Sequence, residues 1–327
     1  MANIDEPPGW AVWILLCMGC GSVNASSLDG NNVDGTSLDG NSLDAATGSD
    51  GQTEPLDAAA QCDPLARFSA PMLVDGLATT NTAAGSLSSD ELAIYTWSNG
   101  VASATTDIYV ASRATITEGF GMLSLLTNVS SDSFSESEPW ISPDGLTLVF
   151  TTNRDGPDHL YAATRSSVLT DFGTFAALSG IQTLGANDSA ASVTADGNEL
   201  WFISDRSGGL GGYDIWRATK SGSAFANPAP VAEVSSVSLE AYPVLSADKL
   251  TIYVSSTRPG GMGGFDIWRA HRSTAADGFG AEELVTELNT TGDDFVKWLS
   301  PDGCRLFIRS NRTGGVDHVF VALRGSR

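Results

Sequence analysis

Basic residues are scarce in this chain. It holds 17 Lys and Arg against 39 Asp and Glu, which gives a formal net charge of −22 at pH 7. None of the basic residues falls within residues 1–60. Nucleic-acid binding needs clustered Lys and Arg, so the composition excludes that class of protein. Cationic partners and metal ions remain open, because charge alone does not select among them.

Histidine and cysteine are also few, with three and four residues respectively. No spacing of His and Cys suits a shared zinc ion, and no Gly-x-Ser-x-Gly nucleophile elbow occurs. We therefore expect neither zinc chemistry nor Ser-His catalysis. We also expect no cofactor, with calcium the one ion that the acidic composition leaves conceivable.

The chain lacks an apolar run long enough to span a bilayer. Its N-terminal apolar stretch, Trp10–Met18, is too short for that and is followed by Gly-Cys20-Gly-Ser. This ending resembles the lipobox of bacterial lipoprotein signal peptides, with two departures: Cys17 replaces the usual leucine, and no Lys or Arg precedes the stretch. We therefore predict a signal peptide at residues 1–19 and lipidation of Cys20. The protein would be an exported periplasmic or outer-membrane lipoprotein of the cell envelope, held to the membrane only through this anchor.

Residues 20–61 are low in complexity. Leu-Asp-Gly or a close variant recurs there every five residues, beginning at Leu28, Val33, Leu38 and Leu43. Too few apolar side chains are present to build a core, so we expect a flexible acidic tether. A calcium-binding array or a pentapeptide solenoid is the alternative, although the ligand spacing of a calcium loop is missing.

A block of about fifty residues then recurs five times. Each copy contains a turn of the Ser-Pro-Asp-Gly type, a run of β-branched and aromatic residues, a polar loop and a second run that opens with aspartate. Proline presets φ and glycine accepts a positive φ, so we expect the turn motif to be structural. Successive turn aspartates lie 52 or 54 residues apart: Asp90, Asp144, Asp196, Asp248 and Asp302.

Each copy has room for four strands, the content of one propeller blade. We therefore predict an all-β fold, a five-bladed β-propeller of four-stranded antiparallel blades over residues 62–327. The N-terminal strand, residues 68–74, should join the last blade, built from residues 295–324, and so close the ring. Cys62 and Cys304 either form a disulfide that reinforces this closure or remain unpaired thiols. We expect a monomer.

The repeat contains Ser142-Pro-Asp-Gly, Asn153-Arg154, Asp158-His-Leu-Tyr, and the Gly-Gly-x-Gly-Gly segments Arg206–Trp216 and Arg258–Trp268. With these segments it resembles the TolB-type, or WD40-like, propeller repeat of bacterial cell-envelope proteins. The resemblance covers residues 68–324 and implies an extracytoplasmic propeller that binds protein. It shows five repeats where TolB has six, and no N-terminal α/β domain, so the partners of TolB itself are not implied.

An acidic residue precedes the turn aspartate by eight positions in four copies: Glu136, Asp188, Glu240 and Asp294. Equivalent positions form a ring around a propeller axis. We therefore expect these carboxylates at the central funnel, where they could bind a cation, a basic side chain or a sugar. Alternatively, each carboxylate pairs with an arginine of a neighbouring blade or caps backbone amides.

The polar loops repeat an arginine, and the second runs repeat their opening aspartate. A residue used in every blade usually solves a problem that every blade has, so we expect inter-strand or inter-blade salt bridges from both sets. The glycine-rich loops join strand to strand without a following helix, which disfavours a phosphate site. The residues are Arg154, Arg206, Arg258 and Arg312, and Asp158, Asp214, Asp266 and Asp317.

We interpret the chain as a non-catalytic scaffold that binds an envelope protein, or peptidoglycan or another glycan. The alternative is a carbohydrate-active propeller, either a glycoside hydrolase or a lectin, that uses the funnel acids together with Trp140 and Trp298. A hydrolase needs two carboxyl groups in unlike environments, whereas the acidic quartet follows the repeat.

Overall fold

The computed structural model describes residues 62–64, 66–77, 82–99 and 105–325. All of them belong to one compact unit that spans Pro55–Arg327. The predicted signal peptide, the lipidation site at Cys20 and the tether lie outside the described residues. Within the described ranges, no helix has the length and apolar character needed to cross a membrane.

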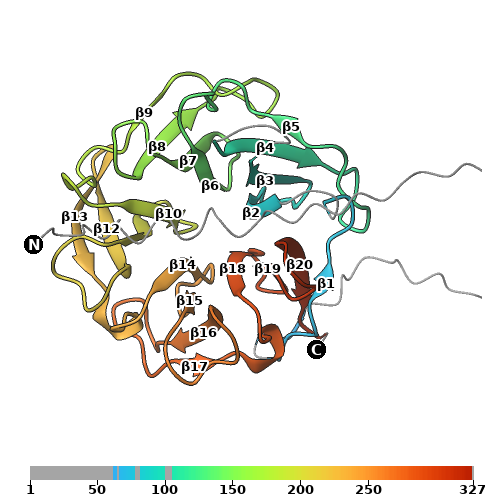
Figure 1. Ribbon diagram of the computed structural model, residues 1–327, viewed down its shortest axis with the longest axis vertical. Coiled ribbons are helices and arrows are strands. Elements are labelled where there is room, and N and C mark those ends of the chain that lie inside the picture. The colour runs from blue at the N-terminus through green and yellow to red at the C-terminus, as the bar shows by residue number, and fades with distance from the viewer. Residues whose placement is uncertain (1–61, 65, 78–81, 100–104, 326–327) are drawn as a thin grey trace, which may run out of the picture. The chain divides into compact units, whose positions relative to one another are not determined.

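The described strands form five four-stranded antiparallel sheets, each of which is one blade of a propeller (Figure 1). The first blade contains β2 Thr82–Leu87, β3 Ala93–Ser98, β4 Asp107–Ser112 and β5 Ser124–Leu125. The second contains β6 Glu136–Ile141, β7 Thr147–Thr152, β8 His159–Thr164 and β9 Phe175–Ala177. The third contains β10 Asp188–Val193, β11 Glu199–Ser204, β12 Asp214–Ser221 and β13 Ala224–Pro230. The predicted fold class is confirmed.

The last two blades complete the ring. The fourth contains β14 Glu240–Leu245, β15 Thr251–Ser256, β16 Asp266–His271 and β17 Glu283–Leu284. The fifth contains β18 Asp294–Leu299, β19 Arg305–Ser310 and β20 His318–Leu323, with β1 Met72–Leu73 as its outer strand. Two short 3₁₀ helices, Ala232–Val234 and Thr286–Leu288, precede β14 and β18.

The N-terminal strand closes the ring as predicted. Met72 pairs with Val321, and an isolated bridge joins Phe68 to Arg324. Cys62 and Cys304 form a disulfide with their Cα atoms 5.7 Å apart, so of the two alternatives for these thiols the structure has the bridge. Strand pairing and a covalent bond therefore both hold the first described residues to the last blade.

The aspartate turns between the first and second strands explain why the repeat is so regular. In the second blade, Ser142 Oγ donates to Asp144 Oδ1 at 2.6 Å, and the same oxygen accepts the Leu146 N–H at 2.9 Å. The other four blades repeat both bonds. The residue that follows the turn aspartate has a positive φ, which is 70° at Gly145. Glycine adopts this conformation readily, whereas two blades have Glu91 and Lys249 at the same position.

The apolar core lies between neighbouring blades. Tyr95 and Ile108 of the first blade pack with Leu148 and Phe150 of the second, and equivalent clusters fill the other interfaces. Each sheet packs against neighbouring blades on both faces. The second strand of a blade is therefore a nearly continuous run of buried β-branched and aromatic residues.

Five innermost strands surround the axis: β2, β6, β10, β14 and β18 (Figure 1). In each blade the start of the first strand, the end of the second and the start of the third lie at one level, as Glu136, Thr152 and His159 do. We call this end of the ring the strand-start face. The opposite end, where the aspartate turns lie, is called the turn face.

Candidate functional site

The four acidic residues expected at the funnel do begin innermost strands, but their side chains are buried, with exposed fractions of 0–1%. Each carboxylate is bonded to the arginine that follows it by 18 residues in the same blade, at N···O distances of 2.5–3.1 Å. The pairs are Glu136–Arg154, Asp188–Arg206, Glu240–Arg258 and Asp294–Arg312.

Other donors bond the same carboxylates. Thr152 Oγ1 and the Ser131 N–H each donate to Glu136 at 2.8 Å, and the fourth and fifth blades repeat both contacts. Burial raises the pKa of Glu136, and the bonds from Thr152 and Arg154 oppose that rise. The expected funnel site is therefore corrected. These carboxylates are enclosed by donors of their own blades and fix the start of each innermost strand.

The glycine-rich loops serve the aspartate that follows them. Asp214 Oδ2 accepts the N–H groups of Leu210 and Gly211 at 3.0 and 3.1 Å, and the fourth blade repeats this arrangement. A Cβ atom on Gly209 would lie 2.0 Å from Asp214 Oδ2, which explains why glycine occupies that position. Because the aspartate already uses the loop amides, the loop is a structural element and not a phosphate cradle.

The expected salt bridges of the repeated arginines are present, and the partner of each arginine is the buried acid at the start of the innermost strand of its own blade. Among the strand-opening aspartates, Asp214 and Asp266 accept loop amides in place of an arginine. Asp317 is ion-paired with Arg309 and not with Arg312. Asp158 differs again, because burial and the nearby charges of Glu138 and Asp205 raise its pKa to about 6.

We expect Asp158→Asn to stabilise the protein at pH 8. The raised pKa means that the protonated carboxyl stabilises the fold fully below the unfolded value near 3.8, and that this stabilisation is lost as pH rises through about 6. The gain in unfolding free energy over wild type should be about 1–3 kcal/mol at pH 8 and should vanish near pH 4. Urea denaturation across this range measures it, with the exposed Asp171→Asn as control for the loss of one charge. An equal gain at both pH values would contradict the assignment.

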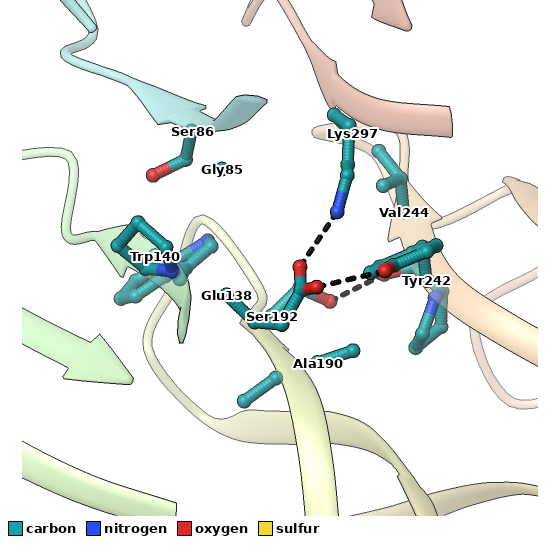
Figure 2. Close-up of a pocket in the computed structure, with 12 residues that line it drawn as sticks. Gly85, Ser86, Glu138, Trp140, Ala190, Ser192, Tyr242, Val244 and Lys297 are labelled. Atoms are coloured by element: carbon teal, nitrogen blue, oxygen red, sulfur yellow. Dashed lines mark hydrogen bonds and ion pairs between the residues drawn. The ribbon is translucent and has the colours of Figure 1, made fainter. Parts of the chain in front are cut away.

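A charged network crosses the axial channel between three blades. Lys297 Nζ donates to Glu138 Oε2 at 2.6 Å, and Tyr242 Oη donates to Glu138 Oε1 at 2.8 Å. Figure 2 shows the amine and the hydroxyl directed at the same carboxylate from different innermost strands. The Lys297 amine also lies 3.3 Å from the centroid of the Tyr242 ring. This network links the second, fourth and fifth blades through the axis.

Burial dominates the electrostatics of this network. The exposed fractions of the Lys297 and Glu138 side chains are 2% and 10%. Burial lowers the pKa of Lys297 to about 8, and Glu138 opposes the shift by favouring the ammonium form. Burial and the adjacent Glu138 charge raise the pKa of Tyr242 well above its ordinary value, so its hydroxyl remains a donor. Glu138 is thus ion-paired with Lys297 and accepts a second hydrogen bond from Tyr242.

The backbone at this network is strained. Glu138, Ala190 and Tyr242 occupy equivalent bulge positions of three innermost strands, and each has a φ of 51°. A positive φ is uncommon for residues other than glycine and often marks a functional position. Sequence reasoning missed this site. The available signal was irregularity, because these positions carry unlike residues within an otherwise regular repeat.

A funnel opens beside the network on the turn face. It encloses a cavity of about 110 Å³ that is lined by all five blades, mostly with apolar side chains, and Lys297 borders its inner end. Trp140 and Trp298, which the sequence analysis singled out, both contribute to its wall. A smaller cavity of about 30 Å³ lies next to it and contains Glu138. Among the residues that the structure describes, the funnel lining includes no carboxylate, and the smaller cavity includes only that of Glu138.

The fold and site together define a five-bladed propeller with a narrow axial channel that a lysine, a glutamate and a tyrosine cross. No protein-family model and no curated protein matches the chain. Among solved structures, it is similar to TolB from Acinetobacter baumannii, with 18% identity, a TM-score of 0.48, and coverage of 76% of this chain and 56% of that one. A TolB-type protein from Agrobacterium tumefaciens gives 17% identity, a TM-score of 0.47, and coverage of 74% and 78%.

A thermostable family-43 glycoside hydrolase is also similar, with 13% identity, a TM-score of 0.49, and coverage of 77% of this chain and 91% of that one. These likenesses concern the fold, which the described sheets establish by their own pairing. The propeller fold that the repeat predicted is confirmed by the described sheets. The chain spans only 56% of the Acinetobacter TolB.

Proposed function

We propose that this propeller is a non-catalytic scaffold that binds an envelope protein or a glycan. The observation that carries the proposal is the state of Glu138, which among the described residues is the one carboxylate that lines either axial cavity. Two donors hold it, so it is neither a free base nor paired with a second acid across a substrate. Glycoside hydrolysis requires two carboxyl groups with different protonation states on either side of the scissile bond.

We also propose that the protein acts outside the cytoplasm as a monomer anchored by lipid at Cys20. The Cys62–Cys304 disulfide supports an oxidising compartment, because structural disulfides persist in exported proteins and are rare in the cytosol. No cofactor is needed for this function.

A lectin is the second candidate. Trp140 and Trp298 in the wall of the axial funnel favour it, since aromatic faces pack against the apolar faces of sugars. A lectin would bind its sugar at the turn face, whereas a protein partner would bind the loops of the strand-start face.

The test is a crosslinking capture from native envelopes with the full-length protein, in the presence and absence of soluble peptidoglycan fragments. We expect a specific protein to be captured, no displacement by the fragments, and no release of reducing ends. The double variant Trp140→Ala, Trp298→Ala should capture the same protein, as should Tyr109→Ala, an aromatic control outside the funnel. Glycan binding that only the tryptophan variant loses would establish the lectin. Glycan cleavage that Glu138→Gln abolishes would overturn the non-catalytic assignment.

A further inference from the structure

The loops of the strand-start face expose apolar side chains at equivalent positions. Leu210, Met262 and Val316 each follow the repeated arginine by four residues in the third, fourth and fifth blades, and their exposed fractions are 54%, 47% and 40%. Val237, in the loop that precedes β14, is 85% exposed. A single exposed apolar residue needs no explanation, but contact with another molecule explains why such residues recur at one position in three neighbouring loops.

Hydrogen bonds fix the loop backbone at two of these residues. Asp214 accepts the N–H of Leu210, and Asp266 accepts that of Met262 at 2.9 Å. The loop of the third blade also lies against the next one, since a Cβ on Gly211 would be 2.6 Å from the Ser238 carbonyl oxygen. Loops fixed in this way lose little conformational entropy on binding, which is a property of pre-organised interfaces.

Exposed charge on the same face is negative. Asp132, Asp155 and Asp205 are exposed in its loops. Among the described residues of this end, the basic side chains are already ion-paired and at most 18% exposed: Arg154, Arg206, Arg258, Arg312, Arg309 and Lys297. The exposed charge offered to a partner is therefore acidic.

We propose that the strand-start face docks a protein segment in which Lys or Arg residues are flanked by apolar side chains. The apolar side chains of the partner would contact Leu210, Met262, Val316 and Val237, and its cations would approach the exposed aspartates. The inference rests on the proposed scaffold function and adds the face and the chemistry of the partner. Such a segment complements both the exposed apolar side chains and the exposed aspartates of this face. An acidic segment would be repelled by the aspartates, and a purely polar segment would leave the apolar side chains without contacts.

The probes are four synthetic fluorescent peptides that combine a central Lys or Glu pair with flanking Leu or Ser. The full-length protein should bind the Lys/Leu peptide at least about tenfold more tightly than the other three, measured by fluorescence anisotropy. Affinity for this peptide should fall as salt rises, because the charged contacts are exposed.

Two variants locate the binding. The triple variant Leu210→Ser, Met262→Ser, Val316→Ser should weaken binding of the Lys/Leu peptide about tenfold. A matched triple variant, Met122→Ser, Val168→Ser, Leu169→Ser, changes exposed apolar residues in loops beyond the turn-face ends of β4 and β8, and should bind as wild type does.

The charge variant Asp132→Asn, Asp155→Asn should weaken binding and flatten its salt dependence. Equal binding by the two triple variants would overturn the assignment of the face.

Loss of binding to phosphatidylcholine–phosphatidylglycerol vesicles in the first triple variant alone would show that the occupant is a membrane, and would overturn the partner chemistry. If none of the peptides binds but envelope capture still recovers a specific protein, only this inference fails. If capture also recovers nothing, the proposed function fails with it.

Discussion

Glu138→Ala should lower the free energy of unfolding by about 3–5 kcal/mol, because it leaves the buried Lys297 ammonium without its counter-charge. Lys297 is 2% exposed, so the variant leaves a buried ammonium without its ion-pair partner, and the Tyr242 hydroxyl loses its acceptor as well. Chemical denaturation at pH 7 measures the change. The exposed pair Arg269–Glu283 provides the control, since Glu283→Ala should change stability by at most about 1 kcal/mol.

A double-mutant cycle separates the charge effect from simple loss of packing. Lys297→Met keeps most of the side-chain volume without the charge. The double variant Glu138→Ala, Lys297→Met should therefore recover most of the stability that Glu138→Ala loses. Additive losses would contradict the network, as would a Glu138→Ala effect no larger than that of Glu283→Ala.

Removing the Cys62–Cys304 disulfide should lower the free energy of unfolding by about 2–5 kcal/mol. The bridge joins residues 242 positions apart, so it restricts nearly the whole propeller segment in the unfolded state. The double variant Cys62→Ser, Cys304→Ser tests this by thermal and chemical denaturation. Reduction of the wild type should reproduce the shift, and reduction of the double variant should add nothing to it. A change below about 1 kcal/mol would mean that the pairing of β1 with β20 alone closes the ring.

The sequence was sufficient to predict the blades and their closure, because the repeat marks each strand and the two chain ends carry complementary parts of one blade. It was not sufficient for the direction of a side chain at a strand end. Glu136 begins an innermost strand as expected, yet its carboxylate turns into the blade toward Arg154. The constant spacing of 18 residues between each acid and its arginine was a usable signal of pairing.

The axial network could not be derived from the repeat, because its residues interrupt the repeat. Glu138 and Lys297 come from innermost strands that are 159 residues apart in the chain. Only the closed ring brings their side chains together. A periodic pattern predicts what every blade shares, while the residues that differ between blades become meaningful only once the strands surround one axis.

The pairing of β1 with β20 also determines when the ring can form during synthesis. Met72 pairs with Val321, so the fifth blade remains incomplete until β20 has been synthesised. Contacts between such distant residues form slowly, because the intervening chain must first be ordered. A chain interrupted before β20 is therefore an open arc with unpaired strand edges, and such edges aggregate by pairing with those of other chains. Shortening this protein from its C-terminus would thus yield an association-prone fragment and not a smaller propeller.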